Sequence, residues 1–398
     1  MLYHRECLDK IKKILNRDEF VILTGARQVG KTSILIMLKD FLEKKGQNSY
    51  YFNLENIEYL KLLNKNPLNI FEMFPLGKTK QNILIDEIQY LENPTNFLKL
   101  LYDEKRKDIK IIASGSSSFY IDKKFRDSLA GRKFLFEVYP LNFNEFLNFN
   151  DEQDLLKQKT KKLTIYYKQK LLNFWKQYLI YGSYPKIALE KDNDIKKILL
   201  EEIGTSYIKK DIRDAGIKNT DKYFSILKIL ADQTGQLVNS QELANTLNMS
   251  HSTVEEYLYV MKKSYQIVLI APFYRNLRKE LTKMPKIYFY DLGLRNFFLN
   301  NYNEIKIRTD KGNYTENIVF KEFMHIEQDV SKIKFWRTQD KKEIDFIVKN
   351  KAYEIKYERL KIKIKNKGYG EFQKQYPEIP FEFLNCIDLL EKFYGWKI

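Results

Sequence analysis

The chain of 398 residues has few residues of the kinds that form disulfide frameworks or zinc sites. Its 2 cysteines, Cys7 and Cys386, lie near opposite ends of the sequence. Its 3 histidines, His4, His251 and His325, are not spaced as zinc ligands are. We therefore expect neither a disulfide framework nor a zinc site.

Long apolar runs are missing as well. No run approaches the roughly 20 residues that a membrane-spanning helix needs, and the mean hydropathy is −0.49. The chain does not open with a basic and then apolar signal segment, so we expect a cytoplasmic protein without a membrane partner. Hydrophobic residues make up 44% of the chain, which is enough for globular cores. The length predicts about two to four domains.

Acidic residues are outnumbered. The chain has 69 Lys and Arg against 52 Asp and Glu, a net charge of +17. This excess favours a polyanionic partner, and nucleic acid (DNA first) before a membrane surface. The alternative is that a Lys-, Ile-, Asn- and Tyr-rich composition reflects biased base composition in the genome and gives a basic surface without a partner.

The clearest motif is the stretch FVILTGARQVGKTS, residues 20–33. Its apolar start predicts a strand, its end predicts a helix, and the turn between them reads Gly-x-x-x-x-Gly-Lys-Thr. Backbone N–H groups of such a turn, together with a helix N-terminus, bind phosphate oxygens. The alternative is a glycine-rich turn that serves packing alone. The predicted nucleotide-binding residues are Gly25, Ala26, Arg27, Gln28, Val29, Gly30, Lys31, Thr32 and Ser33.

Two residues of this loop have specific predicted roles. Lys31 can reach the β- and γ-phosphates, and the Thr32 hydroxyl can coordinate Mg²⁺. Arg27 would either cover the phosphates or pair with a neighbouring acid.

A second motif, NILIDEIQYL, covers Asn82–Leu91. A buried strand that ends in Asp86 and Glu87 is typical of nucleotide sites, where Asp86 would hold Mg²⁺ and Glu87 would polarise the attacking water. Two acids after an apolar run often mark only the end of a buried strand. The phosphate loop upstream favours the nucleotide role.

Further strands are predicted at Ser49–Leu54, in Lys110–Ser118, where the strand runs into a hydroxyl-rich turn, and at Lys133–Tyr139. The strands alternate with helical segments, which predicts a parallel sheet covered on both faces. The strand from Lys110 should lie beside the first strand, so that Ser114 or Ser116 could sense the γ-phosphate. The alternative is a capped strand end.

The order of these motifs resembles the AAA-like P-loop ATPases whose acid pair includes a catalytic glutamate. The segments Leu129–Arg132, Tyr139–Leu141 and Phe143–Phe146 are similar to a widespread prokaryotic subfamily with an uncharacterised C-terminal domain, and Tyr181–Pro185 resembles a Gly-Gly-x-Pro-type segment of its members. The resemblance implies ATP as the nucleotide, Mg²⁺ as cofactor and ATP hydrolysis as the activity. Arg132 is the candidate for a nucleotide-sensing or finger-type arginine, or else a surface arginine at the start of a strand.

Residues 221–300 carry a predicted helix-turn-helix followed by two strands, a winged helix. Ser240 is the expected N-cap of the second helix. The expected wing loop contains Arg275, Arg278, Lys279 and Lys283.

The predicted recognition helix bears residues of both kinds. His251, Ser252 and Thr253 suit a DNA contact, whereas Glu255 and Glu256 would repel phosphates. We expect contact with the DNA backbone rather than base readout. The alternative is a packing module.

A second chemical motif lies in the last hundred residues. Antiparallel strands at Lys342–Val348 and Ala352–Lys356 would bring Asp345 and Glu354 together, with Lys356 on the same face. Two carboxylates can hold Mg²⁺, Lys356 can orient or deprotonate water, and Glu316 could add a ligand.

This arrangement resembles the PD-(D/E)xK restriction-endonuclease-like superfamily, although Ile344 stands where that pattern has proline. The alternative is an exposed hairpin whose charges solvate one face. Downstream, a basic face suited to a backbone-binding groove is predicted at Lys361, Lys363, Lys365 and Lys367.

The sequence thus predicts an α/β protein with four domains: a P-loop AAA-like ATPase core with a parallel sheet (1–147), a helical lid or linker (148–220), a winged helix (221–300) and an α+β restriction-endonuclease-like domain (301–398). In this interpretation the ATP state moves the lid and positions the DNA-facing domains. The alternatives are an ATP-dependent switch that binds a protein partner, with a purely structural tail, and a DNA-binding structural protein whose hydrolysis is incidental. The sequence leaves the oligomeric state open.

Overall fold

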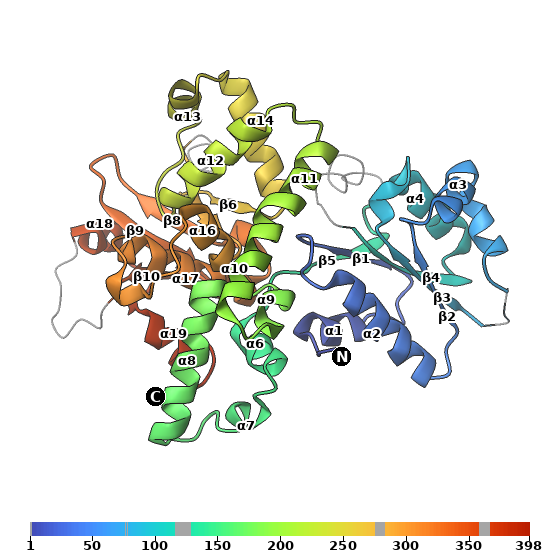
Figure 1. The fold of residues 1–398 in the computed structure, drawn as a ribbon, viewed down its shortest axis with the longest axis horizontal. Helices are drawn as coiled ribbons and strands as arrows, with labels where there is room; N and C mark the ends of the chain where they lie inside the picture. Colours follow the sequence, from blue (N-terminus) through green and yellow to red (C-terminus); the bar gives the residue numbers. More distant parts are fainter. Residues whose placement is uncertain (1, 76, 78, 116–128, 275–282, 358–366) are drawn as a thin grey trace. The chain divides into compact units, whose positions relative to one another are not determined.

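A computed structural model describes the chain except residues 1, 76, 78, 116–128, 275–282 and 358–366 (Figure 1). It divides into two compact units. The first unit comprises Met1–Pro140 and Lys263–Tyr265, and the second comprises Leu141–Lys262 and Gln266–Ile398. The division into four domains stays a prediction.

The first unit is built on a sheet of five strands in the order β2-β3-β4-β1-β5, and all four pairings are parallel. β1, β3 and β4 are buried along their whole length, as strands are when helices cover both faces of a sheet. The predicted parallel sheet and the predicted place of β4 beside β1 are therefore confirmed. The strands are β1 (Phe20–Thr24), β2 (Ser49–Asn53), β3 (Gln81–Asp86), β4 (Ile109–Ser114) and β5 (Lys133–Glu137).

Helices lie on both faces of this sheet (Figure 1). Alternate apolar side chains of the strands, such as Ile22, Ile85 and Ile111, join one buried cluster with side chains of α3, η1 and α4. The opposite face is covered by α2, which contacts β2, β3 and β4. The elements are α1 (Glu6–Lys12), α2 (Lys31–Lys44), α3 (Ile57–Lys65), η1 (Pro67–Glu72), η2 (Ile88–Tyr90) and α4 (Pro94–Lys105).

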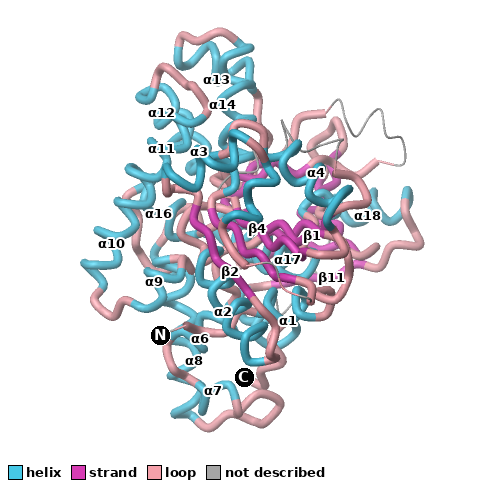
Figure 2. Tube along the Cα trace, turned by 90° about the vertical axis from the view of Figure 1, so that its right-hand side faces the viewer, coloured by secondary structure: helices cyan, strands magenta, loops and turns pink. Residues whose placement is uncertain are grey.

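The second unit opens with a run of helices, shown in cyan in Figure 2. They are α6 (Phe143–Phe149), α7 (Gln153–Leu156), α8 (Ile165–Tyr181), α9 (Pro185–Leu189), α10 (Asn193–Glu202), η3 (Ile203–Tyr207), α11 (Ile208–Asp214), α12 (Thr220–Asp232), α13 (Ser240–Leu247) and α14 (His251–Lys263). The antiparallel hairpin β6 (Ile267–Ile270) and β7 (Lys286–Phe289) follows. Helix, turn, helix and hairpin thus occur in the predicted order.

The expected N-cap of α13 was wrong by one residue. Asn239 is the cap, and its side-chain oxygen accepts from the backbone N–H groups of Gln241 and Glu242 at 3.1 and 3.2 Å. The Ser240 hydroxyl instead bonds the His251 ring at 2.9 Å. Both Asn and Ser are good caps, so the sequence alone could not choose between neighbours.

A second sheet follows α16 (Leu292–Leu299), η4 (Ile305–Ile307), α17 (Lys311–Glu327) and η5 (Val330–Lys332). Its four strands run in the order β11-β10-β9-β8, and β9 pairs antiparallel with β10 as predicted. The strands are β8 (Lys334–Arg337), β9 (Glu343–Val348), β10 (Lys351–Ile355) and β11 (Phe381–Leu384), with α18 (Lys367–Gln375) and α19 (Cys386–Lys392) completing the unit. The α/β class is confirmed. In the part of the chain that the structure describes, no helix has both the length and the apolar composition needed to cross a membrane.

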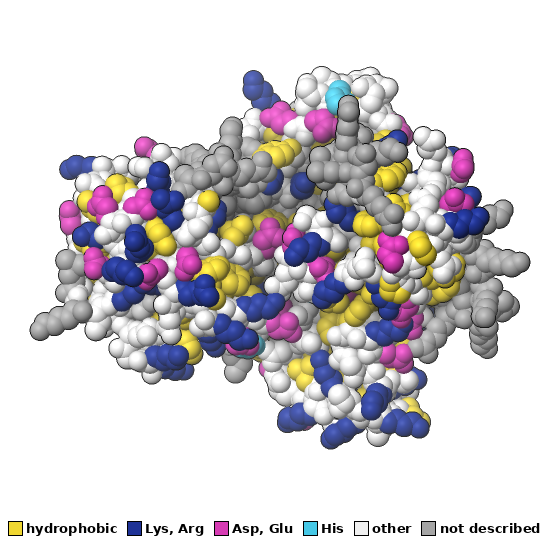
Figure 3. Space-filling view, turned by 180° about the vertical axis from the view of Figure 1, so that it is seen from behind, with side chains coloured by type: hydrophobic (Ala, Val, Ile, Leu, Met, Phe, Trp, Pro, Cys, Tyr) yellow, Lys and Arg dark blue, Asp and Glu magenta, His cyan; other side chains and the backbone are white. Residues whose placement is uncertain are grey.

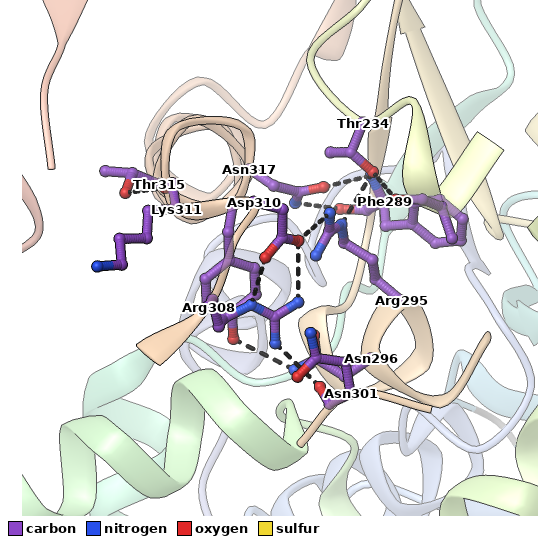
Figure 4. A network of polar contacts seen from close by, with 12 residues as sticks. Thr234, Phe289, Arg295, Asn296, Asn301, Arg308, Asp310, Lys311, Thr315 and Asn317 are labelled. Atoms are coloured by element: carbon purple, nitrogen blue, oxygen red, sulfur yellow. Dashed lines mark hydrogen bonds and ion pairs between the residues drawn. The ribbon is translucent and has the colours of Figure 1, made fainter. Parts of the chain in front are cut away.

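An ionic network joins the segment after α12, α16 and the N-cap of α17 within the second unit (Figure 4). The Asp310 carboxylate accepts from Arg295 at 2.7 Å and from Arg308 at 2.8 and 3.0 Å. Arg295 also donates to the Thr234 hydroxyl at 2.9 Å. Burial raises the pKa of Asp310, but hydrogen bonds and charge from the two guanidinium groups outweigh burial and lower it to about 2. The carboxylate therefore stays ionised and holds the start of α17 against α16.

The Gly-Ser-Tyr-Pro segment noted in the sequence packs against the start of α16. The backbone N–H groups of Ser183 and Leu294 donate to the buried Asp291 carboxylate at 2.7 and 3.1 Å. Gly182 has φ +76°, and a Cβ there would lie 2.1 Å from Asp291 Oδ1. Only glycine fits this turn.

Gly182→Ala should lower the free energy of unfolding of the second unit by about 3 kcal/mol, because it adds both left-handed strain and a steric overlap. Gly216→Ala is the matched control, since Gly216 has φ +75° but a Cβ added there would meet nothing within 4 Å; we expect about 1 kcal/mol there. Urea unfolding followed by tryptophan fluorescence measures both, as all 3 tryptophans lie in this unit. Equal losses would show that the Asp291 contact places no restriction on residue 182.

Candidate functional site

The predicted phosphate loop connects β1 to α2 in the first unit. Gly25 has φ +149°, and a Cβ there would lie 2.2 Å from the backbone oxygen of Val138, so a side chain cannot fit. α2 begins at Lys31, and no acidic residue lies in its first turn to offset the positive end of the helix dipole. This end of the helix can therefore accept an anion.

The Lys31 ammonium lies inside the loop. It donates to the backbone oxygens of Gly25 and Ala26 at 2.9 and 2.7 Å, and the residue is only 6% exposed. Both acceptors belong to the loop itself. The positive charge is thus held among the backbone groups that would surround a phosphate.

The Asp86 carboxylate connects three strand ends to the start of α2. Thr32 and Tyr51 donate their hydroxyls to Asp86 Oδ2 at 2.6 and 2.9 Å, and Ser114 donates its hydroxyl to Oδ1. Burial, with the charge of Asp86, raises the pKa of Tyr51, which keeps the phenol protonated as a donor. Hydroxyl and carboxylate oxygens are the ligands that Mg²⁺ prefers, so Thr32 and Asp86 are suited to hold it together.

Glu87 follows directly after β3 in a left-handed conformation, φ +57°. That conformation costs a non-glycine residue about 1–2 kcal/mol. The Glu87 N–H donates to Asp86 Oδ1 at 3.2 Å and to the Ser114 hydroxyl at 3.4 Å, and its carboxylate contacts the Gln89 amide. Backbone strain of this kind is concentrated at functional sites.

The structure brings Lys31, Thr32, Asp86, Glu87 and Ser114 together at the carboxyl ends of the strands. Arg27, Gln28, Val29 and Ser33 lie in or next to the loop. Ser116 lies outside the described residues.

Arg132 is not part of this group. It pairs with Asp103 of α4 at 2.7 and 3.2 Å, and its backbone oxygen accepts from the N–H of Phe20 at the start of β1. The phosphate loop follows the other end of β1. A sensing role for Arg132 stays a prediction.

Sequence reasoning missed Arg5, which is 4% exposed. Its guanidinium donates to the backbone oxygen of Val29 in the loop at 2.6 Å and to that of Tyr139 at 2.8 Å. It therefore fixes the loop against the segment after β5. A lone arginine upstream of the motif carries no sequence signal for this role. Tyr51 was missed as well, because a tyrosine within a predicted strand carries no sequence signal for a contact with Asp86.

The second unit contains an acidic cluster, which we define as Glu316, Glu343, Asp345 and Glu354. The strand register pairs Tyr353 with Phe346, which brings Glu354 next to Asp345 as the sequence predicted. Asp345 Oδ2 accepts from the Ile355 N–H at 2.7 Å, and Lys356 donates to Glu354 Oε1 at 2.7 Å.

Lys286 and Glu343 are members of this region that the sequence did not indicate. The Lys286 ammonium contacts Glu343 Oε1 and lies 3.5 Å from Glu316 Oε2 and 3.8 Å from Asp345 Oδ1. Lys286 is 1% exposed. Tyr288, two residues along the same strand, donates to Glu316 Oε2 at 3.0 Å. The sequence signal for these contacts was the position of Lys286 and Tyr288 two residues apart in β7, which places both side chains on one face of the strand.

Burial governs the protonation of this cluster. It raises the pKa of Glu316 to about 8, and burial with the neighbouring Asp345 carboxylate raises the pKa of Glu354 to about 7. Burial opposes the charge of Lys286 as well, but the carboxylates of Glu316, Asp345 and Glu343 outweigh it and raise the pKa of Lys286. The Lys286 ammonium therefore stays charged, whereas Glu316 and Glu354 hold their protons to higher pH than free carboxyls do.

The donor chemistry of Asp345 and Glu354 suits Mg²⁺, and Glu354 Oε2 is a buried oxygen with no hydrogen-bond partner within the described part of the chain. The Lys286 ammonium lies on the Asp345 Oδ1 side of the cluster. Among the described residues, no group of three or more His, Cys, Asp and Glu side chains is placed to hold a metal ion. The carboxylates thus have the right chemistry but already contact a cation.

The exposed surface of α14 bears both signs of charge. His251, Ser252, Glu255 and Glu256 are exposed on α14, and His251 lies 3.7 Å from Glu255. On the face drawn in Figure 3, Lys and Arg side chains are dispersed among Asp and Glu rather than gathered in one patch. Of the wing-loop cations Lys283 is exposed, whereas Arg275, Arg278 and Lys279 lie outside the described residues, as do Lys361, Lys363 and Lys365.

Comparison with known families finds matches in both units. Residues 17–147 match a family described as "AAA domain", residues 172–304 match "Domain of unknown function (DUF8612)" and residues 311–388 match "Domain of unknown function (DUF4143)". The AAA match spans all five strands of the parallel sheet and both nucleotide motifs. The first unit is therefore similar to an AAA-type, ATPase-like domain, and this similarity supports nucleotide binding.

Similar full-length proteins are themselves uncharacterised. A protein of Haemophilus influenzae is 29% identical over 379 residues, 92% of this chain and 88% of the relative. A protein of Methanocaldococcus jannaschii is 30% identical over 318 residues, 72% of this chain and 64% of the relative. Among solved structures, AMPPCP-bound DnaA from Aquifex aeolicus is 19% identical and covers 64% of this chain and 86% of its own, with a TM-score of 0.32 that does not establish a shared fold.

Glu316→Gln should flatten the pH dependence of stability. The folded carboxyl has a pKa of about 8 against 4.5 for a free one, so between these values the folded state binds more protons and loses stability as pH rises. Relative to the variant, the wild type should lose on the order of 2 kcal/mol across this window. Urea unfolding at a series of pH values measures it, with the exposed Glu255→Gln as control. Parallel curves for wild type and Glu316→Gln would contradict a buried, protonated Glu316.

Proposed function

We propose that the first unit binds Mg²⁺-ATP and hydrolyses it. The single observation that carries this proposal is the Thr32–Asp86 hydrogen bond of 2.6 Å at the start of α2, next to the Lys31 ammonium inside the loop. The match to an AAA domain supports it.

Each residue then has a role. Lys31 binds the β- and γ-phosphate oxygens, and Thr32 with Asp86 holds Mg²⁺. Bound Mg²⁺ supplies charge stabilisation for the phosphoryl group. Glu87 accepts a hydrogen bond from the attacking water and polarises it. Ser114 orients Asp86.

Two variants separate binding from chemistry. Lys31→Ala should weaken ATP affinity at least tenfold, about 1.4 kcal/mol, because the phosphates lose their ammonium. Glu87→Gln should keep ATP affinity and lower turnover by about 10²–10³-fold, since only the base is lost. Titration with a fluorescent ATP analogue and phosphate release measure these effects.

Lys44→Ala, an exposed position at the far end of α2, is the matched control and should behave as wild type. Unchanged affinity in Lys31→Ala would refute the nucleotide site. Equal turnover in Glu87→Gln would remove Glu87 from the reaction.

We further propose that the second unit acts on DNA, with the helix-turn-helix contacting the backbone and the acidic cluster cutting it. The specific observation in favour is the buried, unpartnered Glu354 Oε2 beside Asp345, with Lys356 at 2.7 Å from the other Glu354 oxygen. In this proposal Asp345 and Glu354 hold Mg²⁺, Glu316 supports them and Lys356 orients the attacking water. The alternative is a switch that binds a protein partner and uses this unit as a scaffold.

Plasmid nicking tests the proposal. At millimolar Mg²⁺ the wild type should nick supercoiled DNA, and Asp345→Asn and Lys356→Met should each lose at least about 10²-fold in rate because they remove a metal ligand and the water-orienting cation. Lys349→Ala, in the exposed turn of the same hairpin, should retain the rate. Assays with and without ATP show whether the nucleotide controls cutting. No nicking of any DNA form by the wild type would leave the cluster structural.

A further inference from the structure

The acidic cluster already contains a cation that belongs to the protein. Lys286 places its ammonium within 4 Å of three carboxylates, those of Glu316, Glu343 and Asp345. Its side chain is 1% exposed, so water does not screen these contacts. A buried charge is tolerated only when it is paired in this way.

The backbone that carries Lys286 is fixed on both sides. β7 pairs with β6, where Ile270 is the partner of Lys286, and Leu237 bridges Lys286 from the segment after α12. Lys286 therefore reaches the cluster from the hairpin that follows the helix-turn-helix. The side chain, not the strand, is the part that can move.

The other end of the cluster remains open to a cation. Glu354 is 7% exposed, and its Oε2 has no hydrogen-bond partner in the described part of the chain. Lys356 binds only Oε1, at 2.7 Å. A buried carboxylate oxygen without a donor is costly, and a divalent ion between Glu354 and Asp345 would satisfy it.

The Lys286 ammonium and a metal ion bound to Glu354 would both need the Asp345 carboxylate. Its Oδ2 accepts a hydrogen bond from the Ile355 N–H, so Oδ1 has more lone-pair capacity left for a metal, and Oδ1 is the atom that faces Lys286 at 3.8 Å. Two cations this close repel each other strongly in a buried site.

We propose that Lys286 is a tethered competitor of the divalent metal: its ammonium and the metal ion occupy the Asp345 side of the acidic cluster in turn. The inference rests on the proposed metal site and adds its regulation. Metal binding displaces the ammonium. Conversely, the ion pairs that hold Lys286 in the cluster weaken metal binding. Because Lys286 belongs to the β6–β7 hairpin, a ligand bound to that hairpin is coupled to the metal site.

Mn²⁺ titration followed by electron paramagnetic resonance, without nucleotide, tests this directly. The variants are Lys286→Met, which keeps the apolar stem, and Lys286→Gln, which keeps an N–H donor toward Glu343 and so protects folding. Lys286→Arg keeps the charge, and Lys283→Met, an exposed lysine close in the sequence, is the matched control. The background is Asp86→Asn, so that the proposed Mg²⁺ site at Thr32 and Asp86 does not contribute. Each variant is first checked by thermal melting.

Mn²⁺ should bind at least tenfold more tightly to Lys286→Met and Lys286→Gln than to wild type, Lys286→Arg and Lys283→Met. Adding Asp345→Asn should abolish the gain, and Mn²⁺ should raise the melting temperature of the neutral variants more than that of wild type.

Two results overturn the proposal in distinguishable ways. Equal, tight Mn²⁺ binding in wild type and both neutral variants would show a metal site that Lys286 does not oppose, and the proposed DNA cutting would stand. No binding to the cluster in any variant would refute the metal site and its regulation together.

Discussion

The Asp86 carboxylate is the group on which the first unit depends. It receives hydroxyls from β2, β4 and α2, so one buried charge fixes the ends of three parallel strands relative to the phosphate loop. Removal of its partners would leave a buried carboxylate unsatisfied, which is costly. The same oxygens are the ones that suit Mg²⁺. In the proposed Mg²⁺ site, stability and nucleotide chemistry would therefore draw on one side chain.

The second unit uses buried charge differently. In the Arg295–Asp310–Arg308 network two guanidinium groups share one carboxylate, so the positive charge that a metal would supply is already present. The acidic cluster has the opposite balance, because its four carboxylates outnumber the three cationic side chains that contact them, Lys286, Lys356 and Arg337. Desolvation penalises such an excess of like charge, which is why protons, an ammonium or a divalent ion must be present. The cluster is therefore chemically responsive, whereas the arginine network is structural.

Much of the first unit could be predicted from its sequence because the signals are local. The apolar runs before Gly25 and Asp86 are fully buried strands, and the loop between β1 and α2 has the length and residues that phosphate binding requires. The hairpin that carries Asp345 and Glu354 could also be predicted from the sequence, because strand alternation and a two-residue turn fix its register.

The missed residues act over long sequence distances. Arg5 reaches Val29 and Tyr139, and Lys286 reaches Asp345, through the packing of elements whose relative placement no local pattern encodes. Arg132 shows the converse: local sequence did not indicate its position, which the parallel strand order places at the end of β1 away from the loop, and its sensing role stays a prediction. Tertiary topology decides such cases, and short motifs do not.

The central claim is that Thr32 and Asp86 act as one unit in holding Mg²⁺-ATP. A double-mutant cycle on Mg²⁺-ATP affinity with Thr32→Val and Asp86→Asn tests it most directly. We expect strong non-additivity, with the double variant only slightly weaker than either single variant and a coupling energy of about 1 kcal/mol or more. Losses that simply add, within about 0.5 kcal/mol, would contradict it.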